Sequence, residues 1–298
     1  MMTLFLTYEL KVAVLIAVFY VFWRLLVANE TWHRLNRIVL LSTAVASFVL
    51  PLCVITIHQT VEVMPTTAEV QNNGEMISSE TSITRPVPDS GGHLETEYPF
   101  DWSLLLTLIY IIGVVVVLSR MGLSLWRLHR MTLASEIHPL ADGRQIAVND
   151  EAKTPFSWWK TVFINRNDYE EGATALLTHE LGHIRLHHSA DVLLVELLTA
   201  LQWFNPTMWM LRADLRTIHE YEADQQVLSH GFNDIQYLHL LIRKAASQSG
   251  YSLANGFINS TLKKRISMMT KPKSSRKKWL KIAYILPIVA ISLYASCE

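Results

Sequence analysis

Residues 179–183 read HELGH, and this stretch decides how the rest of the chain is interpreted. On a helix, positions i and i+4 share one face, so the imidazoles of His179 and His183 would lie one turn apart. Two such histidines can bind one zinc ion, and the glutamate between them, Glu180, can activate a water on the metal. The pentapeptide therefore predicts a helical zinc site, with Zn²⁺ as the cofactor.

The flanking residues favour a helix around this motif. Asp168 followed by Glu171 has the spacing of a capping box at a helix start. The run from Ala173 to Leu177 then leads into the motif without a proline. We therefore expect a single helix that begins near Asp168 and carries both histidines.

A catalytic zinc site uses a third protein ligand beside its open water position. The best candidate is Glu220, on a second predicted helix. Asn205 reads as the N-cap of that helix and Pro206 as its first residue. The helix is expected to run to about Ser229, with Gly231 just past its end.

Other carboxylates on this second helix leave alternatives open. Asp224 shares a face with Glu220, so we expect it to orient a ligating histidine from the second shell around the metal. Glu222 is rotated by roughly 200° and is the weaker alternative ligand. The three acids could also be a solvated helix face. The HELGH motif upstream favours the metal site.

The composition is that of an integral membrane protein. Half of the 298 residues are hydrophobic, and the excess is concentrated in three long runs and a shorter fourth. These runs cover residues 12–27, 38–57, 104–125 and 280–295. The first run reads as a signal anchor because a second run follows it directly. We expect a mainly α fold with about four transmembrane helices, although the fourth run could also be a buried helix.

The loop charges predict one orientation, which the net charge of zero hides. Basic residues lie between the first two runs, after the third and before the fourth, whereas residues 58–101 are strongly acidic. The positive-inside rule then places the N-terminus and residues 58–101 outside, and the zinc site in the cytoplasm. The basic cluster at 271–281 fits anionic lipid headgroups. The sequence shows no interleaving of basic and aromatic residues, so we expect no direct contact with nucleic acid.

Residues 190–211 are apolar enough to suggest a fifth span, but geometry argues against one. A single crossing would place His183 and Glu220 on opposite sides of the membrane. A hairpin of two crossings needs roughly 34 to 40 apolar residues, more than residues 184–219 supply. We expect a buried helix, or one lying against the inner leaflet with Trp203 and its aromatic neighbours near the headgroups.

Two short strands are expected before the HELGH helix, at residues 145–148 and 161–164, around the PFSWW stretch at 155–159. A strand beside a zinc cleft commonly holds an extended peptide by edge pairing. For residues 161–164 this role is a hypothesis, and an ordinary core strand is the alternative.

With these residues in hand, the chain resembles the membrane metallopeptidases of the BlaR/MecR antirepressor family. The resemblance rests on HELGH, on WFNP at 203–206 and on the pair of Glu220 and Asp224. It extends to the layout of three spans, a zinc domain and a fourth span. EYEAD at 220–224 also resembles the Ste24/HtpX-type quality-control proteases of membranes, which are kept as an alternative.

The resemblance implies a zinc metallopeptidase of the HExxH…E type in the bacterial inner membrane. Zinc would be held by His179, His183 and Glu220, and Glu180 would pass a proton from water to the leaving amine. Such proteins receive an outside signal and cleave themselves or a cytoplasmic target, which leads to loss of a winged-helix repressor. The best-known members carry a penicillin-binding sensor after the fourth span, whereas this sequence ends at Glu298. We therefore expect no beta-lactam receptor in this chain.

The domain organisation follows from the spans and the resemblance. We expect two transmembrane helices with a short cytoplasmic loop in 1–57, a disordered extracytoplasmic linker in 58–101, a third transmembrane helix in 102–126, a cytoplasmic zincin-like α+β protease domain in 127–278 and a fourth transmembrane helix in 279–298. The expected partners are a protein substrate and the lipid bilayer, and a homodimer is compatible with this layout.

Some assignments stay open. The group that stabilises the oxyanion is not fixed. Its candidates are His187, His188, His219, Tyr221 and Arg216. Gly182 is expected to let the HELGH helix approach its neighbour closely. The basic segment 263–278 could be a self-cleavage site or a membrane anchor. The competing class is a non-proteolytic signalling scaffold, which would not need Glu180.

Overall fold

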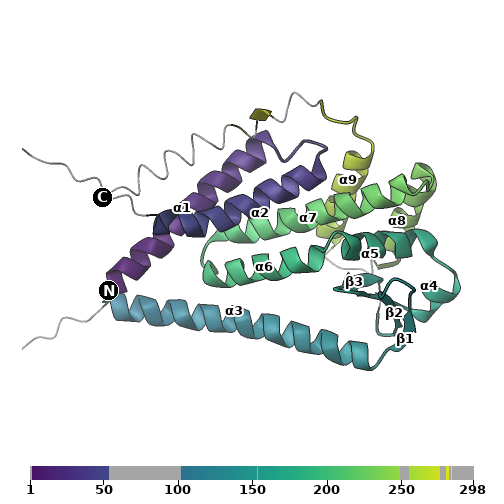
Figure 1. Cartoon of the computed structure of the whole chain (residues 1–298), viewed down its shortest axis with the longest axis horizontal. Coiled ribbons are helices and arrows are strands. Elements are labelled where there is room, and N and C mark those ends of the chain that lie inside the picture. The colour runs from purple at the N-terminus through teal and green to yellow at the C-terminus, as the bar shows by residue number, and fades with distance from the viewer. Residues whose placement is uncertain are drawn as a thin grey trace, which may run out of the picture.

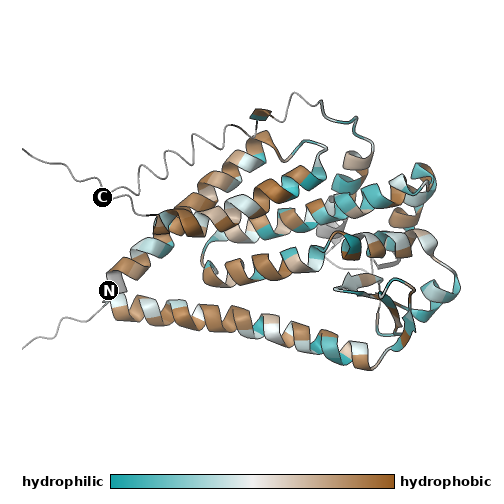
Figure 2. Ribbon diagram, viewed as in Figure 1, coloured by the Kyte–Doolittle hydropathy of each residue, from teal (hydrophilic) through white to brown (hydrophobic). Residues whose placement is uncertain are grey.

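Three long apolar helices dominate the architecture (Figure 1). The computed structural model describes residues 2–53, 102–152, 154–248, 255–275, 280–281 and 283. The long helices are α1 (Met2–Leu26), α2 (His33–Val49) and α3 (Trp102–Leu133), and a short 3-10 helix, η1 (Leu50–Leu52), follows α2. Each of the three, with η1 included in the second, is long and apolar enough to cross a membrane, and Figure 2 shows apolar residues along them. They overlap the first three predicted runs, of which residues 54–57 lie outside the described part of the chain.

The segment expected to be a disordered outer linker and nearly all of the expected fourth span lie outside the described residues. The remainder of the described chain forms a small sheet and further helices. These are β1 (Glu136–Pro139), β2 (Gln145–Val148), β3 (Phe156–Trp158), β4 (Thr161–Ile164), α4 (Arg166–Glu170), α5 (Thr174–Arg185), α6 (His188–Leu201), α7 (Pro206–Ser229), α8 (Asp234–Gln248) and α9 (Asn255–Met269). The chain is thus mainly helical with one small sheet.

The sheet has the order β1-β2-β4-β3, with β2 and β4 parallel and the other pairs antiparallel. Both predicted strands are confirmed as β2 and β4, but the hypothesis that 161–164 is an edge strand is wrong. All four residues of β4 are buried, because β2 and β3 cover its two sides. β3 is the edge strand on this side of the described sheet, and it packs against α5.

The helix of the HELGH motif does not begin at Asp168. Asn165 is the N-cap of the short helix α4, and its side chain accepts a hydrogen bond from the amide of Asp168 at 2.7 Å. Gly172 has a φ of +63°, a left-handed conformation that ends the helical path before α5 starts at Thr174. The spacing from Asp168 to Glu171 is therefore not a capping box. Asp168 is instead buried and pairs with Lys244 of α8.

The start and end of α7 are confirmed as predicted. The Asn205 side chain accepts a hydrogen bond from the Thr207 amide at 3.0 Å, and Pro206 is the first helical residue. The helix ends at Ser229, and Gly231 follows with a φ of +86°. At 24 residues, α7 is about 36 Å long. It therefore extends from the apolar helices to the polar end of the molecule.

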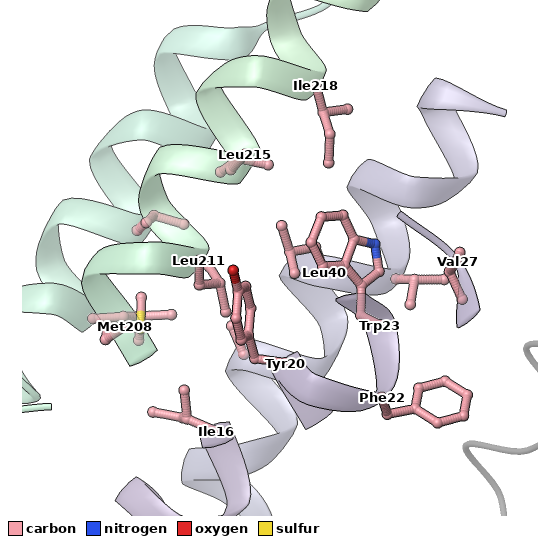
Figure 3. Packing of buried hydrophobic residues seen from close by; sticks show 14 of the residues in the cluster. Ile16, Tyr20, Phe22, Trp23, Val27, Leu40, Met208, Leu211, Leu215 and Ile218 are labelled. Carbon is pink, nitrogen blue, oxygen red and sulfur yellow. The ribbon is translucent and has the colours of Figure 1, made fainter. Parts of the chain in front are cut away.

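The largest hydrophobic core lies between α1, α2 and the first half of α7 (Figure 3). From α7, Leu211 and Leu215 are 1% exposed, and they pack with Tyr20 of α1 and Leu40 of α2. Tyr20 also donates a hydrogen bond from its hydroxyl to Asp214 of α7 at 2.7 Å. The apolar N-terminal helices and α7 thus share one core.

The turn between α6 and α7 lies against the middle of the apolar part of α3. The Trp203 indole donates to the Tyr110 carbonyl at 3.2 Å, and the Tyr110 hydroxyl donates to the Leu201 carbonyl at 3.0 Å. Trp203 thus packs beside Tyr110, inside the apolar run 104–125, and its position at the headgroups stays a prediction. Residues 190–211 form parts of α6 and α7, which pack against each other. Leu197 and Phe204 are 46% and 42% exposed, so this stretch is only partly buried.

Gly113 of α3 makes this packing possible, since a Cβ atom there would overlap the indole of Trp203. We expect Gly113→Ala to displace the indole and to lower the free energy of unfolding by about 1–3 kcal/mol. Thermal unfolding in detergent measures the effect. The matched control is Gly122→Ala on the same helix, where an added Cβ meets nothing within 4 Å. Equal melting temperatures for the two variants would contradict the packing.

Candidate metal centre

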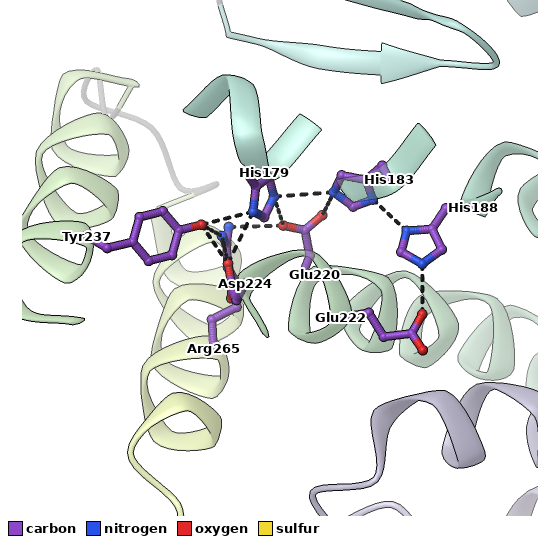
Figure 4. A network of polar contacts seen from close by, with 8 residues as sticks. All are labelled: His179, His183, His188, Glu220, Glu222, Asp224, Tyr237 and Arg265. Carbon is purple, nitrogen blue, oxygen red and sulfur yellow. Dashed lines mark hydrogen bonds and ion pairs between the residues drawn. The ribbon is translucent and has the colours of Figure 1, made fainter. Parts of the chain in front are cut away.

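Two helices bring the predicted metal donors together (Figure 4). α5 carries His179 and His183, whose Nε2 atoms lie 3.3 Å apart. Glu220 of α7 places Oε2 at 3.4 Å from Nε2 of His179, and Oε1 at 3.7 Å from Nε2 of His183. The three side chains singled out by the sequence thus converge on one point.

The donor set and its spacing fit a zinc ion. Ligands at zinc bond lengths in a tetrahedron lie roughly 3.3 Å from one another. The three separations above are close to that value, and the three donor atoms lie within 4.8 Å of one another. The same side chains line a cleft of about 920 Å³, which leaves room for water and a substrate. This group is therefore able to hold a metal ion beside an accessible cavity.

Asp224 and Tyr237 hold the other side of the first histidine. The Nδ1 atom of His179 lies 2.9 Å from the Tyr237 hydroxyl and 3.3 Å from Oδ1 of Asp224. The tyrosine donates its own proton to the same Asp224 oxygen at 2.8 Å. Asp224 and Tyr237 are 1% and 2% exposed. The predicted contact between Asp224 and a metal-site histidine is present, and it fixes the ring that would face the metal.

Arg265 of α9 neutralises the two carboxylates of this half of the site. Its Nη1 lies 3.0 Å from Oε2 of Glu220, and its Nε and Nη2 lie 2.9 and 2.5 Å from the two oxygens of Asp224. Burial alone would raise the pKa of Asp224, but hydrogen bonds from His179 and Arg265 outweigh burial and lower it. Burial likewise opposes ionisation of Glu220, but hydrogen bonding to His179 and the charges of His179 and Arg265 lower its pKa, so both carboxylates stay ionised. Residues 263–269 of the basic segment belong to this helix.

A second set of polar groups holds the other histidine. Nδ1 of His183 lies 2.7 Å from Nδ1 of His188, and Nε2 of His188 lies 2.8 Å from Oε2 of Glu222. Burial lowers the pKa of His188, so its ring is neutral. Glu222 is 4% exposed and points away from the metal donors, as its helical rotation predicted. Neither it nor Asp224 belongs to a solvated face.

Glu180 lines the same cleft as the metal donors. It is 9% exposed, and burial raises the pKa of its carboxyl above the ordinary value. The charge of His179 acts in the opposite direction and lowers this pKa. A partly desolvated carboxylate beside a metal centre is suited to accept a proton from water.

The structure separates the five candidates for oxyanion stabilisation. His188, His219 and Arg216 line the cleft. His188 and His219 are tied to acidic partners, and Arg216 pairs with Glu196. His187 lines a separate cavity and Tyr221 packs on His33.

Gly182 lies where α5 approaches α7. A Cβ atom there would be 3.4 Å from the Gln226 side chain and 3.5 Å from Cα of Ala223. The expected close approach of the two helices at this glycine is confirmed.

Sequence reasoning missed Tyr237 and Arg265. Neither of them belongs to the HELGH or EYEAD stretches, and each comes from an element whose position depends on tertiary packing. In the sequence, Arg265 is distinguished only as part of the basic segment 263–278. Buried carboxylates need a cation nearby. Two of them predicted at one site would therefore have indicated a basic partner.

We predict that metal binding depends on pH, because one of the histidine donors is protonated in the absence of metal. Burial would lower the pKa of His179, but Asp224 and Glu220 outweigh it and raise the pKa to about 10. The pKa of His183 is lowered to about 3, chiefly by burial. Only His179 must therefore lose a proton when it becomes a ligand at neutral pH. Zinc affinity should rise about tenfold per pH unit from pH 6.5 to 8.5.

A competition titration of zinc against a chelator of known affinity, at several pH values, measures this dependence. Calorimetry in two buffers of different ionisation enthalpy counts the released proton. An affinity that stays constant over this range would contradict the protonated state of His179.

The comparison with protein families agrees with this geometry. A family model described as BlaR1 peptidase M56 matches residues 2–269, which include the long apolar helices and the whole candidate metal centre. A search of curated proteins gave no match. The chain therefore belongs to the BlaR1 peptidase family M56, a family of membrane metallopeptidases.

Proposed function

We propose that this protein is a zinc metalloendopeptidase that works at the membrane and cleaves a protein segment bound in the cleft beside α5. One observation carries the proposal. Glu180 lines the same cleft as His179, His183 and Glu220, whose donor atoms are spaced for a metal ion. The match to a peptidase family supports the reaction type.

The residues of the cleft have two roles, to hold the metal and to transfer a proton. When bound by His179, His183 and Glu220, zinc would supply a Lewis acid that polarises the scissile carbonyl and makes water more acidic. Glu180 accepts the proton of the attacking water and then delivers it to the leaving amine. Burial raises the pKa of the Glu180 carboxyl toward neutral, where such a base works best.

The substrate backbone is proposed to bind along β3. This strand pairs with β4 on one side and is the edge of the described sheet. Its residues 156–158 line the cleft together with Glu180. An extended peptide added to such an edge would form main-chain hydrogen bonds, which favour a segment without regular structure. We thus assign the edge pairing with an extended peptide to β3, and not to residues 161–164 of β4.

The membrane arrangement is the one predicted from charge. The N-terminus and residues 58–101 would lie outside a bacterial inner membrane, the metal centre would lie on the cytoplasmic side, and residues 279–298 would be a fourth span. The contacts of Trp203 with α3 add one feature to this arrangement. The turn between α6 and α7 would enter the bilayer from the inside without crossing it, covered by α1 and α3.

The biological role is proposed to be signal transduction. The chain would cleave itself or a cytoplasmic winged-helix repressor after an outside signal. The shared core of α1, α2 and α7 supports this role, because a displacement of the apolar helices would act directly on the helix that carries Glu220.

The test is metal content and cleavage of the detergent-purified full chain, before and after a chelator. We expect about one zinc per chain, and cleavage of itself or of a candidate repressor that stops on chelation and returns with zinc. Glu220→Gln should lose the metal, whereas Glu171→Gln, on an exposed turn, should keep it. Absence of zinc from the wild-type protein would remove the foundation of the proposal. Zinc without cleavage in the presence of the signal would favour the scaffold.

A further inference from the structure

Arg37 of α2 contacts three of the helices that surround the metal centre, α5, α6 and α7. Its Nε lies 2.5 Å from Oδ2 of Asp191 on α6, and its Nη1 lies 3.2 Å from Oε2 of Glu222 on α7. Its Nη2 donates to the carbonyl of Leu186, the C-cap of α5, at 2.7 Å. That carbonyl has no partner within its helix, so the guanidinium completes the helix end. The side chain is 15% exposed.

The contact with Glu222 leads to the metal centre. Oε2 of Glu222 is shared by Arg37 and by Nε2 of His188. The other nitrogen of His188, Nδ1, lies against Nδ1 of His183. A continuous path of four side chains thus runs from α2 to a proposed metal donor.

If His183 binds a metal through Nε2, the direction of each hydrogen bond along this path follows. His183 must keep the lone pair on Nε2 for the metal, so its proton is on Nδ1 and points at His188. His188 must then accept on Nδ1 and carry its own proton on Nε2, which it donates to Glu222. Glu222 accepts from both His188 and Arg37. Every donor meets an acceptor, so the path holds the His183 ring in a single orientation.

A second set of contacts also fixes the position of His188. Asp191, bound to Arg37, also lies 2.9 Å from Nε2 of His219. The ring of His219 stacks on that of His188, with 4.0 Å between centroids and 11° between planes. Arg37 therefore fixes His188 both through Glu222 and through the stacked ring.

We propose that Arg37 is a positioning residue for the metal centre, which links the apolar helix α2 to His183 through Glu222 and His188. The inference rests on the proposed function, because it assigns His183 as a metal ligand. It adds a route by which the apolar helices control the site. A displacement of α2 relative to α7 would break the contact between Arg37 and Glu222 and release the His183 ring.

The experiment compares zinc affinity and the cobalt spectrum in full-length variants in detergent. Arg37→Gln should lower zinc affinity by about 10-fold, the lower end of the range for losing a direct partner of a metal ligand, because Glu222 and His188 lie between Arg37 and His183. The visible absorption of the Co²⁺-substituted protein should also change, because the His183 ring reorients. Arg37→Lys should not restore either value, since an ammonium cannot reproduce three contacts in a fork geometry. Arg34→Gln, exposed on the same helix, is the control and should resemble wild type.

Two further variants keep the test valid if Arg37→Gln folds poorly. The double variant Arg37→Met with Glu222→Gln removes both charges together and should show the same fall in affinity. His188→Phe interrupts the path while leaving Arg37 and Glu222 paired, and it should do likewise. Wild-type zinc affinity and cobalt spectrum in all folded variants would overturn the inference, provided that His183→Ala loses the metal. If wild type and His183→Ala bind zinc equally, the proposed metal centre itself fails.

Discussion

Glu180→Gln is expected to keep the metal and to abolish cleavage. The amide has almost the same shape as the carboxylate, so the metal donors of α5 and α7 stay in place. It cannot accept a proton from water, however, and a positioned general base is worth about 10²- to 10⁴-fold in rate. Metal analysis and cleavage of a fixed substrate, both on the same purified sample, measure the two properties separately.

Glu171→Gln is the matched control for this variant, because it removes one carboxylate from an exposed turn before α5. It should retain both metal and activity. Unchanged cleavage by Glu180→Gln would sink the assignment of the base. Loss of the metal together with activity would mean that Glu180 is needed to build the site rather than to move a proton.

Local patterns predicted the two helices that carry the proposed donors. The i, i+4 spacing of His179 and His183, and the cap formed by Asn205 and Pro206, depend only on neighbouring residues. Such rules also indicated that Glu220 and Asp224 share one face of α7. The same rules failed at Asp168, where burial of the carboxylate and the turn at Gly172 outweigh the spacing of a capping box.

The supporting groups could not be predicted in this way. Tyr237 is 58 residues from His179, and Arg37 is 185 residues from Glu222. Their contacts depend on how α8 and α2 pack against α5 and α7, which no short spacing encodes. The edge position of β3 likewise depends on the order of strands in the sheet. Sequence thus identified the chemistry of the site, whereas tertiary packing determined which groups hold it.

Arg265→Met is expected to cause the largest loss of stability among single changes at the site. The side chain is 14% exposed and, with the protonated ring of His179, neutralises the buried carboxylates of Glu220 and Asp224. Its removal leaves two carboxylates with one cation, and an uncompensated buried charge costs about 3–5 kcal/mol. Thermal unfolding of the chelated full-length protein in detergent measures the loss. Lys264→Met, exposed on the same helix, is the control and should have a nearly wild-type melting temperature.

Two conditions make this prediction specific to the ion pair. Zinc at the proposed donors would supply positive charge beside Glu220, so added zinc should recover part of the lost stability. The pKa of Asp224 is depressed in the folded wild type, so its contribution is present above the unfolded pKa and is lost only as pH falls through the folded value. Without Arg265 the folded pKa rises, and the stability of the variant should fall at higher pH than that of wild type. Equal losses with and without zinc, and parallel pH curves for variant and wild type, would mean that Arg265 acts by packing rather than by its charge.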